Sequence, residues 1–393
     1  MKSIYTFFAL SFLALSAIAK PIIVFDAGST GTRVYLYDVT HVDGKTTVNT
    51  LASYKPASNS AFAFPVTDVK FAMDPVAYFD HFMTEIEKTS FDHLSTHIYV
   101  HATAGVRMAK NKANIIFDMR KGIRGAVKDD TYPIIPNANI GTITVAEEAF
   151  NIWINDQYVA GKLDNNTLSL DNTLAAVEMG GASAEISVLA DSAMDLTRNE
   201  MVFPHHDNDY HVYSTGYDGS GQDKALKAMV EAYADDLDER FSGCFPVDAV
   251  YSSEYAPDII GTGDFENCSG FITDHPVNYY KKSPAANNYL LSSSGFYFTF
   301  KTLGLANQDT LQTTTNAELA SAGVAFCARD WEDLVAAYPS ESPSFLILYC
   351  FNSAYQHHFL SEIGVADTAK LLSVDKYNGN AMTWTLGVAY ING

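Results

Sequence analysis

The chain contains one short pattern twice, and this repetition limits the folds that it can adopt. Residues 22–38 read IIVFDAGSTGTRVYLYD, and residues 174–190 read LAAVEMGGASAEISVLA. Each segment is an apolar strand, a carboxylate, a tight turn of small and hydroxyl residues, and a second apolar strand. Two such hairpins predict two related lobes that face each other, with phosphate groups bound in the cleft between them.

The composition is that of a folded protein with two domains. The chain has 393 residues, of which 47% are hydrophobic and only 18% are charged, and this is enough apolar material for two packed interiors. The formal net charge of -21 argues against a nucleic-acid partner, because such partners need clustered Lys and Arg. The charge by itself indicates no more than solubility. A small anionic ligand would need backbone N–H groups and a divalent cation.

The first residues have the features of a secretory signal peptide. Lys2 gives a short positive start, residues 4–15 are mostly apolar, and Ala17 and Ala19 offer small residues at a cleavage site. We predict cleavage after Ala19 and export of residues 20–393, to the periplasm or out of the cell. The alternative, an uncleaved anchor, is disfavoured because the apolar run is short for a membrane span. No later segment predicts a span, and we expect a monomer.

The four cysteines lie in the second half of the chain. An even number in an exported protein favours two disulfides, for which three pairings are possible. The pairing that closes the shortest loops is Cys244–Cys268 with Cys327–Cys350. A zinc site is disfavoured, because no Cys-x-x-Cys or nearby His pair exists.

Predicted strands and helices alternate through most of the chain, which is the α/β pattern. The predicted strands are residues 22–26, 34–39, 97–102, 174–179, 185–189 and 345–349. The predicted helices are residues 75–89, 106–116, 144–158 and about 354–363, and residues 191–344 read as more irregular than the rest of the chain. Turn residues near 161–166 suggest a first lobe over 20–160, joined by a segment near 365–393, and a second lobe over 161–364.

Both turns carry groups that suit a phosphate. In the first turn Gly28 and Gly31 let backbone N–H groups point at an anion, and Asp26 ends the preceding strand. In the second turn Gly180 and Gly181 have the same role, after the carboxylate of Glu178. The first turn is not a Walker A loop, because no Gly-Lys-Ser/Thr follows.

Two further segments contribute chemistry. Residues 102–107, ATAGVR, read as a strand end followed by a helix start, where Thr103 and the next N–H groups suit an anion. Glu147 and Glu148 open a predicted helix, with Thr142 or Thr144 as its cap. Adjacent helical carboxylates point about 100° apart, so only one of them can face a given cleft.

These segments, in this order, resemble the conserved regions of the nucleoside triphosphate diphosphohydrolase (apyrase, ectonucleotidase) family. The resemblance covers residues 26–33, 102–107, 147–153 and 178–186, and extends to SGFYF at 294–298 and WTLG at 384–387. It implies a two-lobed actin-like, ribonuclease H-like α/β fold with the active site in the interlobe cleft. It also implies hydrolysis of the terminal phosphate of nucleoside triphosphates, with a divalent cation (Mg²⁺, Ca²⁺ or Mn²⁺). Whether diphosphates are cleaved as well stays open at this point.

The resemblance also assigns roles to residues. Glu148 matches the catalytic base, Ser183 and Glu185 match residues that position the attacking water, and Thr103 would steady the terminal phosphate. Asp26 and Glu178 match the acidic residues that hold the metal through its waters. The remaining phosphate contacts would come from the two turns and the segment after Ala102: Gly28, Ser29, Thr30, Gly31, Thr32, Arg33, Ala104, Gly180, Gly181 and Ala182.

The chain departs from the family pattern at three of these positions. Glu178 stands where Asp is common, Glu185 where Gln is common, and Gly31 where animal members often have His. Glu185 places an extra carboxylate beside the predicted water, so it would be protonated, turned away or drawn to the metal. With the small number of cysteines, these departures resemble a bacterial branch of the family.

The family stacks nucleobases on aromatic side chains of the second lobe. Asn352 and Tyr355 resemble that region, and Tyr377 is the candidate for the other face of the base. Two alternatives to a nucleotide hydrolase remain open at this point. One is an exopolyphosphatase-like phosphohydrolase, and the other is a nucleotide-binding module without catalysis.

Overall fold

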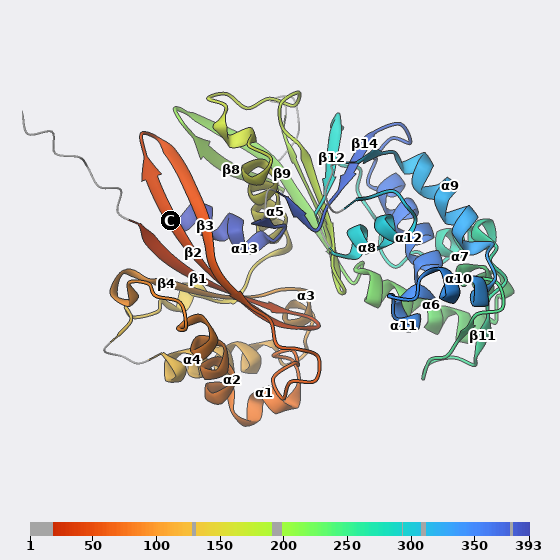
Figure 1. The fold of residues 1–393 in the computed structure, drawn as a ribbon, viewed down its shortest axis with the longest axis horizontal. Helices are drawn as coiled ribbons and strands as arrows, with labels where there is room; N and C mark the ends of the chain where they lie inside the picture. Colours follow the sequence, from red (N-terminus) through yellow and green to blue (C-terminus); the bar gives the residue numbers. More distant parts are fainter. Residues whose placement is uncertain (1–18, 128–130, 191–198, 293, 308–311, 378–379) are drawn as a thin grey trace, which may run out of the picture.

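The computed structural model describes residues 19–127, 131–190, 199–292, 294–307, 312–377 and 380–393. All but the last residue of the predicted signal peptide therefore lies outside the described residues. Two β-sheets organise the described chain, and helices lie on their outer faces and between them (Figure 1).

The first sheet holds the first glycine turn. Its five strands have the order β3-β2-β1-β4-β5. They are β1 (Lys20–Gly28), β2 (Gly31–Val42), β3 (Lys45–Tyr54), β4 (His97–Ala102) and β5 (Ile140–Thr142). Strand β1 is buried along its whole interior, as expected of a central strand covered on both faces. Its parallel pairing with β4 sets Asp26 beside His101 and Ala27 beside Ala102, which brings the ATAGVR segment next to the turn.

The second sheet holds the second glycine turn. Its seven strands have the order β13-β14-β12-β6-β7-β9-β8. They are β6 (Ala175–Met179), β7 (Ser183–Leu189), β8 (Glu200–His205), β9 (Asn208–Asp218), β12 (Asn288–Leu291), β13 (Thr313–Thr314) and β14 (Lys370–Ser373). Two small ribbons pair β10 (Val250–Tyr251) with β11 (Ile259–Ile260), and β15 (Lys376–Tyr377) with β16 (Asn380–Ala381).

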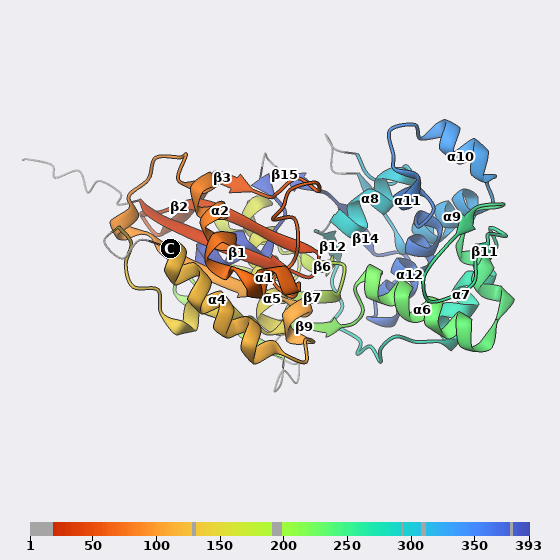
Figure 2. The same ribbon diagram turned by 90° about the horizontal axis from the view of Figure 1, so that it is seen from below.

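Most helices cover the outer faces of the sheets, and Figure 2 shows the two groups at opposite ends of the molecule. Those of the first lobe are α1 (Val69–Met73), α2 (Pro75–Ile86), α3 (Ala104–Arg107) and α4 (Lys112–Ala126). Those of the second are α6 (Gln222–Asp236), α7 (Phe265–Asp274), α8 (Ser294–Thr302), α9 (Asn316–Cys327), α10 (Trp331–Ala337), α11 (Pro343–Leu346) and α12 (Tyr349–Glu362). Short 3₁₀ turns lie at η1 (His93–Ser95), η2 (Asn137–Asn139), η3 (Lys162–Asp164) and η4 (Glu239–Cys244).

Two helices, α5 (Val145–Val159) and α13 (Trp384–Asn392), lie between the sheets (Figure 1). One apolar cluster joins residues of both sheets to both helices, with Trp153 fully buried in it. Thr144 caps α5 by accepting a hydrogen bond from Glu147 N–H, while the Glu147 carboxylate accepts one from Thr144 N–H. This capping box fixes where α5 begins, and therefore where Glu148 lies.

The C-terminal segment and the helices between the sheets do not divide simply at the predicted lobe boundary. Strand β14 pairs with β12 in the second sheet, whereas α13 packs against α5 and the first sheet. The segment near 365–393 is thus divided between the two sheets. The boundary between residues 160 and 161 stays a prediction, because α5 packs against strands of the second sheet.

The structure corrects three of the predicted elements. Residues 345–349 are not a strand, because α11 and α12 occupy them. Ser342 and Pro343 start a helix there, and a short apolar run does not by itself distinguish a buried strand from a buried helix. The predicted helix over 106–116 is broken between α3 and α4. Residues 199–292, part of the segment predicted to be more irregular than the rest, contain strands β8, β9 and β12 and helices α6 and α7.

The structure contains the disulfides Cys244–Cys268 and Cys327–Cys350. Both lie in the core of the second lobe, and all four cysteines are fully buried. Within the described residues no helix has the length and apolarity needed to cross a bilayer.

The double substitution Cys327→Ser/Cys350→Ser should lower the free energy of unfolding by about 3 kcal/mol, because the bond closes a loop of 23 residues in the unfolded chain. Chemical denaturation followed by fluorescence measures this loss. Reduced wild-type protein with the same stability as oxidised wild type would contradict the expectation.

Candidate functional site

The two glycine turns open into one cavity of about 780 Å³. Most of the predicted site residues line it. They are Asp26, Gly28, Ser29, Thr30, Arg33, Thr103, Ala104, Glu148, Glu178, Gly180, Gly181, Ala182, Ser183, Glu185 and Asn352. Gly31, Thr32, Tyr355 and Tyr377 are not among the lining residues.

The first turn connects β1 to β2. Asp26 and Arg33 face each other across this hairpin, and Arg33 Nη1 donates a hydrogen bond of 3.1 Å to Asp26 Oδ2. Gly31 has a φ of 153°, which side-chain residues rarely adopt, so its contribution is to the turn. Thr32 is buried behind the turn. Burial raises the pKa of Asp26, and the positive charge of Arg33 opposes this effect.

The second turn connects β6 to β7 and is supported from behind. Gly180 N–H donates to Ser183 O at 3.0 Å, which closes the turn. The residues after β9 bind its outer side, since Gly219 N–H donates to Ala182 O at 2.7 Å and Gln222 N–H donates to Gly180 O at 2.9 Å. The backbone of this turn is therefore held in place before any ligand binds.

The second conserved segment supports the first turn in a similar way. Thr103 follows β4 and precedes α3, and its N–H donates to Ala27 O at 3.4 Å. Gly105 lies so close to the first turn that a Cβ atom there would be 2.9 Å from Ser29 Cα. A side chain at 105 would therefore displace the backbone that carries Ser29 and Thr30.

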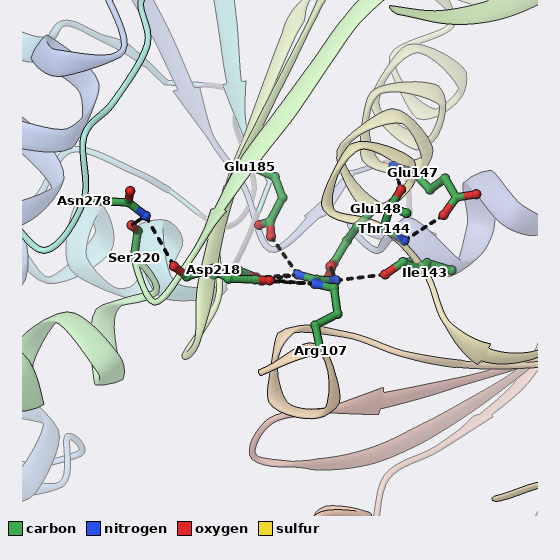
Figure 3. A network of polar contacts seen from close by, with 10 residues as sticks. Arg107, Ile143, Thr144, Glu147, Glu148, Glu185, Asp218, Ser220 and Asn278 are labelled. Carbon is green, nitrogen blue, oxygen red and sulfur yellow. Dashed lines mark hydrogen bonds and ion pairs between the residues drawn. The ribbon is translucent and has the colours of Figure 1, made fainter. Parts of the chain in front are cut away.

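Arg107, at the end of α3, joins the groups at the base of the cavity (Figure 3). Its Nη1 donates to Glu148 Oε2 at 2.6 Å, and its Nη2 donates to Asp218 Oδ1 at 2.7 Å. The same Nη2 lies 3.5 Å from Ser183 Oγ and 3.9 Å from Glu185 Oε1. Burial would lower the pKa of Arg107, but Glu148 and Asp218 outweigh it and raise that pKa, so the side chain is a fixed cation.

Arg107 and Asp218 were not predicted to be site residues. Arg107 stands at the end of the ATAGVR segment, and its place in that motif was the available signal. Asp218 lies at the end of β9, far from every glycine turn in the sequence, so no local pattern indicated it.

Glu148 is buried, with 5% of its surface exposed. Burial raises its pKa to about 7, while the charge of Arg107 lowers it and the charges of Asp26 and Asp218 raise it. A carboxyl group that exchanges its proton near neutral pH suits a general base. Glu147 is exposed and caps the helix, so Glu148 is the member of the pair that faces the cavity.

Glu178 and Glu185 pair across the β6–β7 hairpin. Burial raises the pKa of both side chains well above the ordinary value, and Glu148 adds to the effect in each case. Glu185 is directed toward the cavity and Arg107, as Figure 3 shows. Of the three outcomes considered for Glu185, burial among other carboxylates favours the protonated form.

Asp26 and Glu178 end equivalent strands and line the same cavity. Among the described residues, Glu178 Oε2 is buried without a hydrogen-bond partner. The described part of the chain contains no group of three or more His, Cys, Asp or Glu side chains that could hold a metal directly. Two carboxylates in one cavity, one of them with an oxygen that has no hydrogen-bond partner among the described residues, fit a hydrated cation. Mg²⁺ is such a cation, since it retains several of its waters in proteins.

The predicted nucleobase residues separate in the structure. Asn352 lines the cavity, but Tyr355 is fully buried in the core, where it stacks on Phe351 and donates to Ser220 O at 2.9 Å. Tyr377 packs beside a small apolar cluster instead. Other aromatic side chains line this end of the cavity, namely Phe298, Phe345 and Tyr349. The incorrect strand over 345–349 concealed two of them, because Phe345 lies in α11 and Tyr349 begins α12, and both line the cavity.

Comparison with known proteins identifies the family. Residues 14–392 match the model of the GDA1/CD39 (nucleoside phosphatase) family. The chain belongs to this family. One similar protein is ectonucleoside triphosphate diphosphohydrolase 1 of Mus musculus, which is 26% identical over 93% of this chain and 79% of the relative. Another is probable apyrase 3 of Arabidopsis thaliana, which is 24% identical over 93% of this chain and 80% of the relative.

Solved structures show the same fold. A nucleoside triphosphate hydrolase from Neospora caninum matches with a TM-score of 0.70 at 13% identity, over 95% of this chain and 92% of that one. A Ppx/GppA family protein of Aquifex aeolicus matches with a TM-score of 0.51 at 11% identity, over 95% of this chain and 97% of that one. The predicted two-lobed actin-like α/β fold is therefore confirmed.

The family membership also confirms the enzyme class predicted from the sequence, a nucleoside triphosphate diphosphohydrolase, at the level of the family. The bacterial branch of this GDA1/CD39 member stays a prediction. The residue roles predicted from the resemblance likewise stay predictions.

The close approach at Gly105 makes a testable prediction. Gly105→Ala should lower the free energy of unfolding by about 1–3 kcal/mol, because the added Cβ meets the backbone of Ser29. Gly141→Ala is the matched control, since a Cβ there would meet no atom within 4 Å. Thermal denaturation of both variants measures the difference, and equal melting temperatures would refute the expectation.

Proposed function

We propose that this chain is an exported, divalent-cation-dependent hydrolase that removes the terminal phosphate of nucleoside triphosphates and diphosphates. One observation carries the proposal: both glycine turns, the buried carboxyl of Glu148 and the pair Asp26 and Glu178 line the same cavity. The named relatives, apyrases and ectonucleoside triphosphate diphosphohydrolases, support the choice of substrate.

The proposed reaction is direct attack of water on the terminal phosphorus. Glu148 accepts a proton from the water as its oxygen bonds to phosphorus, and the bond from phosphorus to the bridging oxygen breaks. The shortened nucleotide leaves with the electron pair of that bond. Ser183 lines the cavity, and its hydroxyl would orient the water. No phosphorylated side chain is needed.

The backbone of the two turns would bind the phosphate chain. Gly28, Ser29 and Thr30 line the cavity from the first lobe, and Gly181 and Ala182 line it from the second. Their N–H groups would be the donors. Fixed N–H groups of this kind stabilise negative charge that develops on phosphate oxygens. Arg33 and Thr103 also line the cavity and would add a charge and a hydroxyl.

Asp26 and Glu178 would hold a divalent cation through its water ligands. When bound, such an ion neutralises charge on the phosphates and orients the terminal group for attack. The protein's own contribution is to hold these two carboxylates at the ends of β1 and β6. At Glu178 it leaves one buried oxygen without a hydrogen-bond partner among the described residues.

The nucleobase would occupy the end of the cavity formed by the second lobe. Phe345 is 63% exposed and lines the cavity with Phe298 and Tyr349, so an aromatic face is available for stacking. The amide of Asn352 lines the same end. Tyr355 has no part in this proposal, because it is fully buried.

Export is proposed from two features. The first residues have the pattern of a signal peptide, and the two buried disulfides are typical of proteins that fold in an oxidising compartment. The periplasm and the extracellular space both fit these features.

Phosphate release by residues 20–393 tests the proposal. ATP and ADP should each release phosphate with Mg²⁺, Ca²⁺ or Mn²⁺, and EDTA should abolish the release. Glu148→Gln should lower kcat by about a hundredfold to ten-thousandfold, because it removes the proton acceptor. Glu147→Gln is the matched control, since its side chain is exposed and its amide oxygen can still cap the helix.

Other results would point to other functions. Release from inorganic polyphosphate but not from nucleotides would favour an exopolyphosphatase-like enzyme. Nucleotide binding without any phosphate release, unchanged by Glu148→Gln, would favour a binding module.

The pKa of Glu148 predicts a pH dependence. A base must be unprotonated, so kcat/KM should rise with pH and level off above about pH 7. The charge of Arg107 lowers this pKa, so Arg107→Gln should move the rise to higher pH. The titration of the nucleotide itself cannot shift with a protein substitution. A rise at the same pH in wild type and Arg107→Gln would therefore show that Glu148 is not the titrating group.

A further inference from the structure

We propose that Asp218 is a positioning residue for this hydrolysis, and that it acts by holding the guanidinium of Arg107 in the orientation that presents Nη1 to Glu148. The inference rests on the proposed function, in which Glu148 accepts the proton of the attacking water. Asp218, the last residue of β9, lies outside the two glycine turns, the ATAGVR segment and the start of α5.

The contacts divide the guanidinium between two partners. Nε donates to both oxygens of Asp218, at 3.0 and 3.2 Å, and Nη2 donates to Asp218 Oδ1 at 2.7 Å. Nη1 is left for Glu148 Oε2 at 2.6 Å and for Ile143 O at 3.3 Å. Figure 3 shows Asp218 and Glu148 on opposite sides of the guanidinium. A planar cation held along one edge has a fixed direction for its other edge.

Asp218 is itself held against the second glycine turn. It is the last residue of β9 and pairs with Ser183 at the start of β7. The next residue, Gly219, has a φ of 90° and donates its N–H to Ala182 O at 2.7 Å. Asn278 Nδ2 donates to Asp218 O at 3.3 Å. Asp218 therefore moves with the turn that carries Ser183 and the second set of phosphate-binding N–H groups.

Arg107 belongs to the first lobe, so the contact with Asp218 also crosses the cleft. On the first-lobe side, α3 packs against the first glycine turn through Gly105 and Ser29. The ion pair between Arg107 and Asp218 therefore links the two glycine turns, and Arg107 also binds the carboxyl group of Glu148. Asp218 does not line the cavity, so it would affect catalysis through Arg107 and not through the substrate.

The surrounding charges explain why a second partner is needed. Arg107 faces three carboxyl groups, those of Glu148, Asp218 and Glu185. Without Asp218, Nε would lose its partner and Nη2 would keep, among the described residues, only the 3.5 Å hydrogen bond to Ser183 Oγ. The guanidinium could then turn to engage both oxygens of Glu148 or to approach Glu185. Either movement would take the Glu148 oxygens away from the water.

The test compares Asp218→Ala, Asp218→Asn and a control, Asp209→Ala, at an exposed position of the same strand. ATP hydrolysis with Mg²⁺ gives kcat and KM, and thermal denaturation reports stability. Asp218→Ala should lower kcat by about tenfold to a hundredfold with KM unchanged, at a temperature at which the variant is still folded. Its melting temperature should also fall, because the buried guanidinium of Arg107 loses a partner. Asp218→Asn keeps one acceptor oxygen and should lose less. Asp209→Ala should match the wild type.

The double variant Glu148→Gln/Asp218→Ala makes the test specific. If Asp218 acts through Glu148, the double variant should be no slower than Glu148→Gln alone. A further loss equal to that of Asp218→Ala, or a wild-type kcat in Asp218→Ala, would overturn the inference. If Asp218→Ala does not fold, a wild-type kcat in Asp218→Asn would overturn it. Wild-type protein that hydrolyses no nucleotide would instead overturn the proposed function.

Discussion

The buried guanidinium of Arg107 is the interaction on which the rest of the site depends. A cation with only 8% of its side chain exposed is costly unless it is paired and hydrogen-bonded. Here it is shared by Glu148 and Asp218, which come from the helix between the sheets and from the second sheet. The three groups compensate one another, and their separation fixes how the two lobes meet at the base of the cavity.

Around this cation the site concentrates negative charge. Asp26, Glu148, Glu178 and Glu185 are all buried or nearly so, and burial raises the pKa of each. A cluster of carboxyl groups is a poor place for an anionic phosphate unless cations balance it. Arg33 and Arg107 supply part of that balance, and a hydrated divalent ion between Asp26 and Glu178 would supply more. The cluster of carboxyl groups therefore disfavours binding of a phosphate alone and favours binding of a phosphate together with a cation.

Much of the site could be predicted from the sequence because its parts are local. Each of these parts is encoded by a few adjacent residues: a carboxylate at the end of a strand, a glycine turn, or the capped start of a helix. The turn around Gly28, the turn around Gly180 and the position of Glu148 were predicted in this way, and the structure brings them to one cavity. The base-binding end could not be predicted as well. Tyr355 and Phe345 are both aromatic residues in an apolar segment, and only packing decides which is buried and which is exposed.

The sequence by itself determined the repeated hairpin and the α/β alternation, and its motifs indicated the family, because each of these follows from local patterns along the chain. It favoured one of three disulfide pairings, and the structure contains that pairing. Tertiary structure alone decided that Asp218 would reach Arg107 from 111 residues away. It also decided that residues 345–349 would be helical and that Tyr355 would be enclosed. The physical reason is the same in each case. Burial and charge compensation depend on partners that are distant in sequence, and a local pattern carries no information about them.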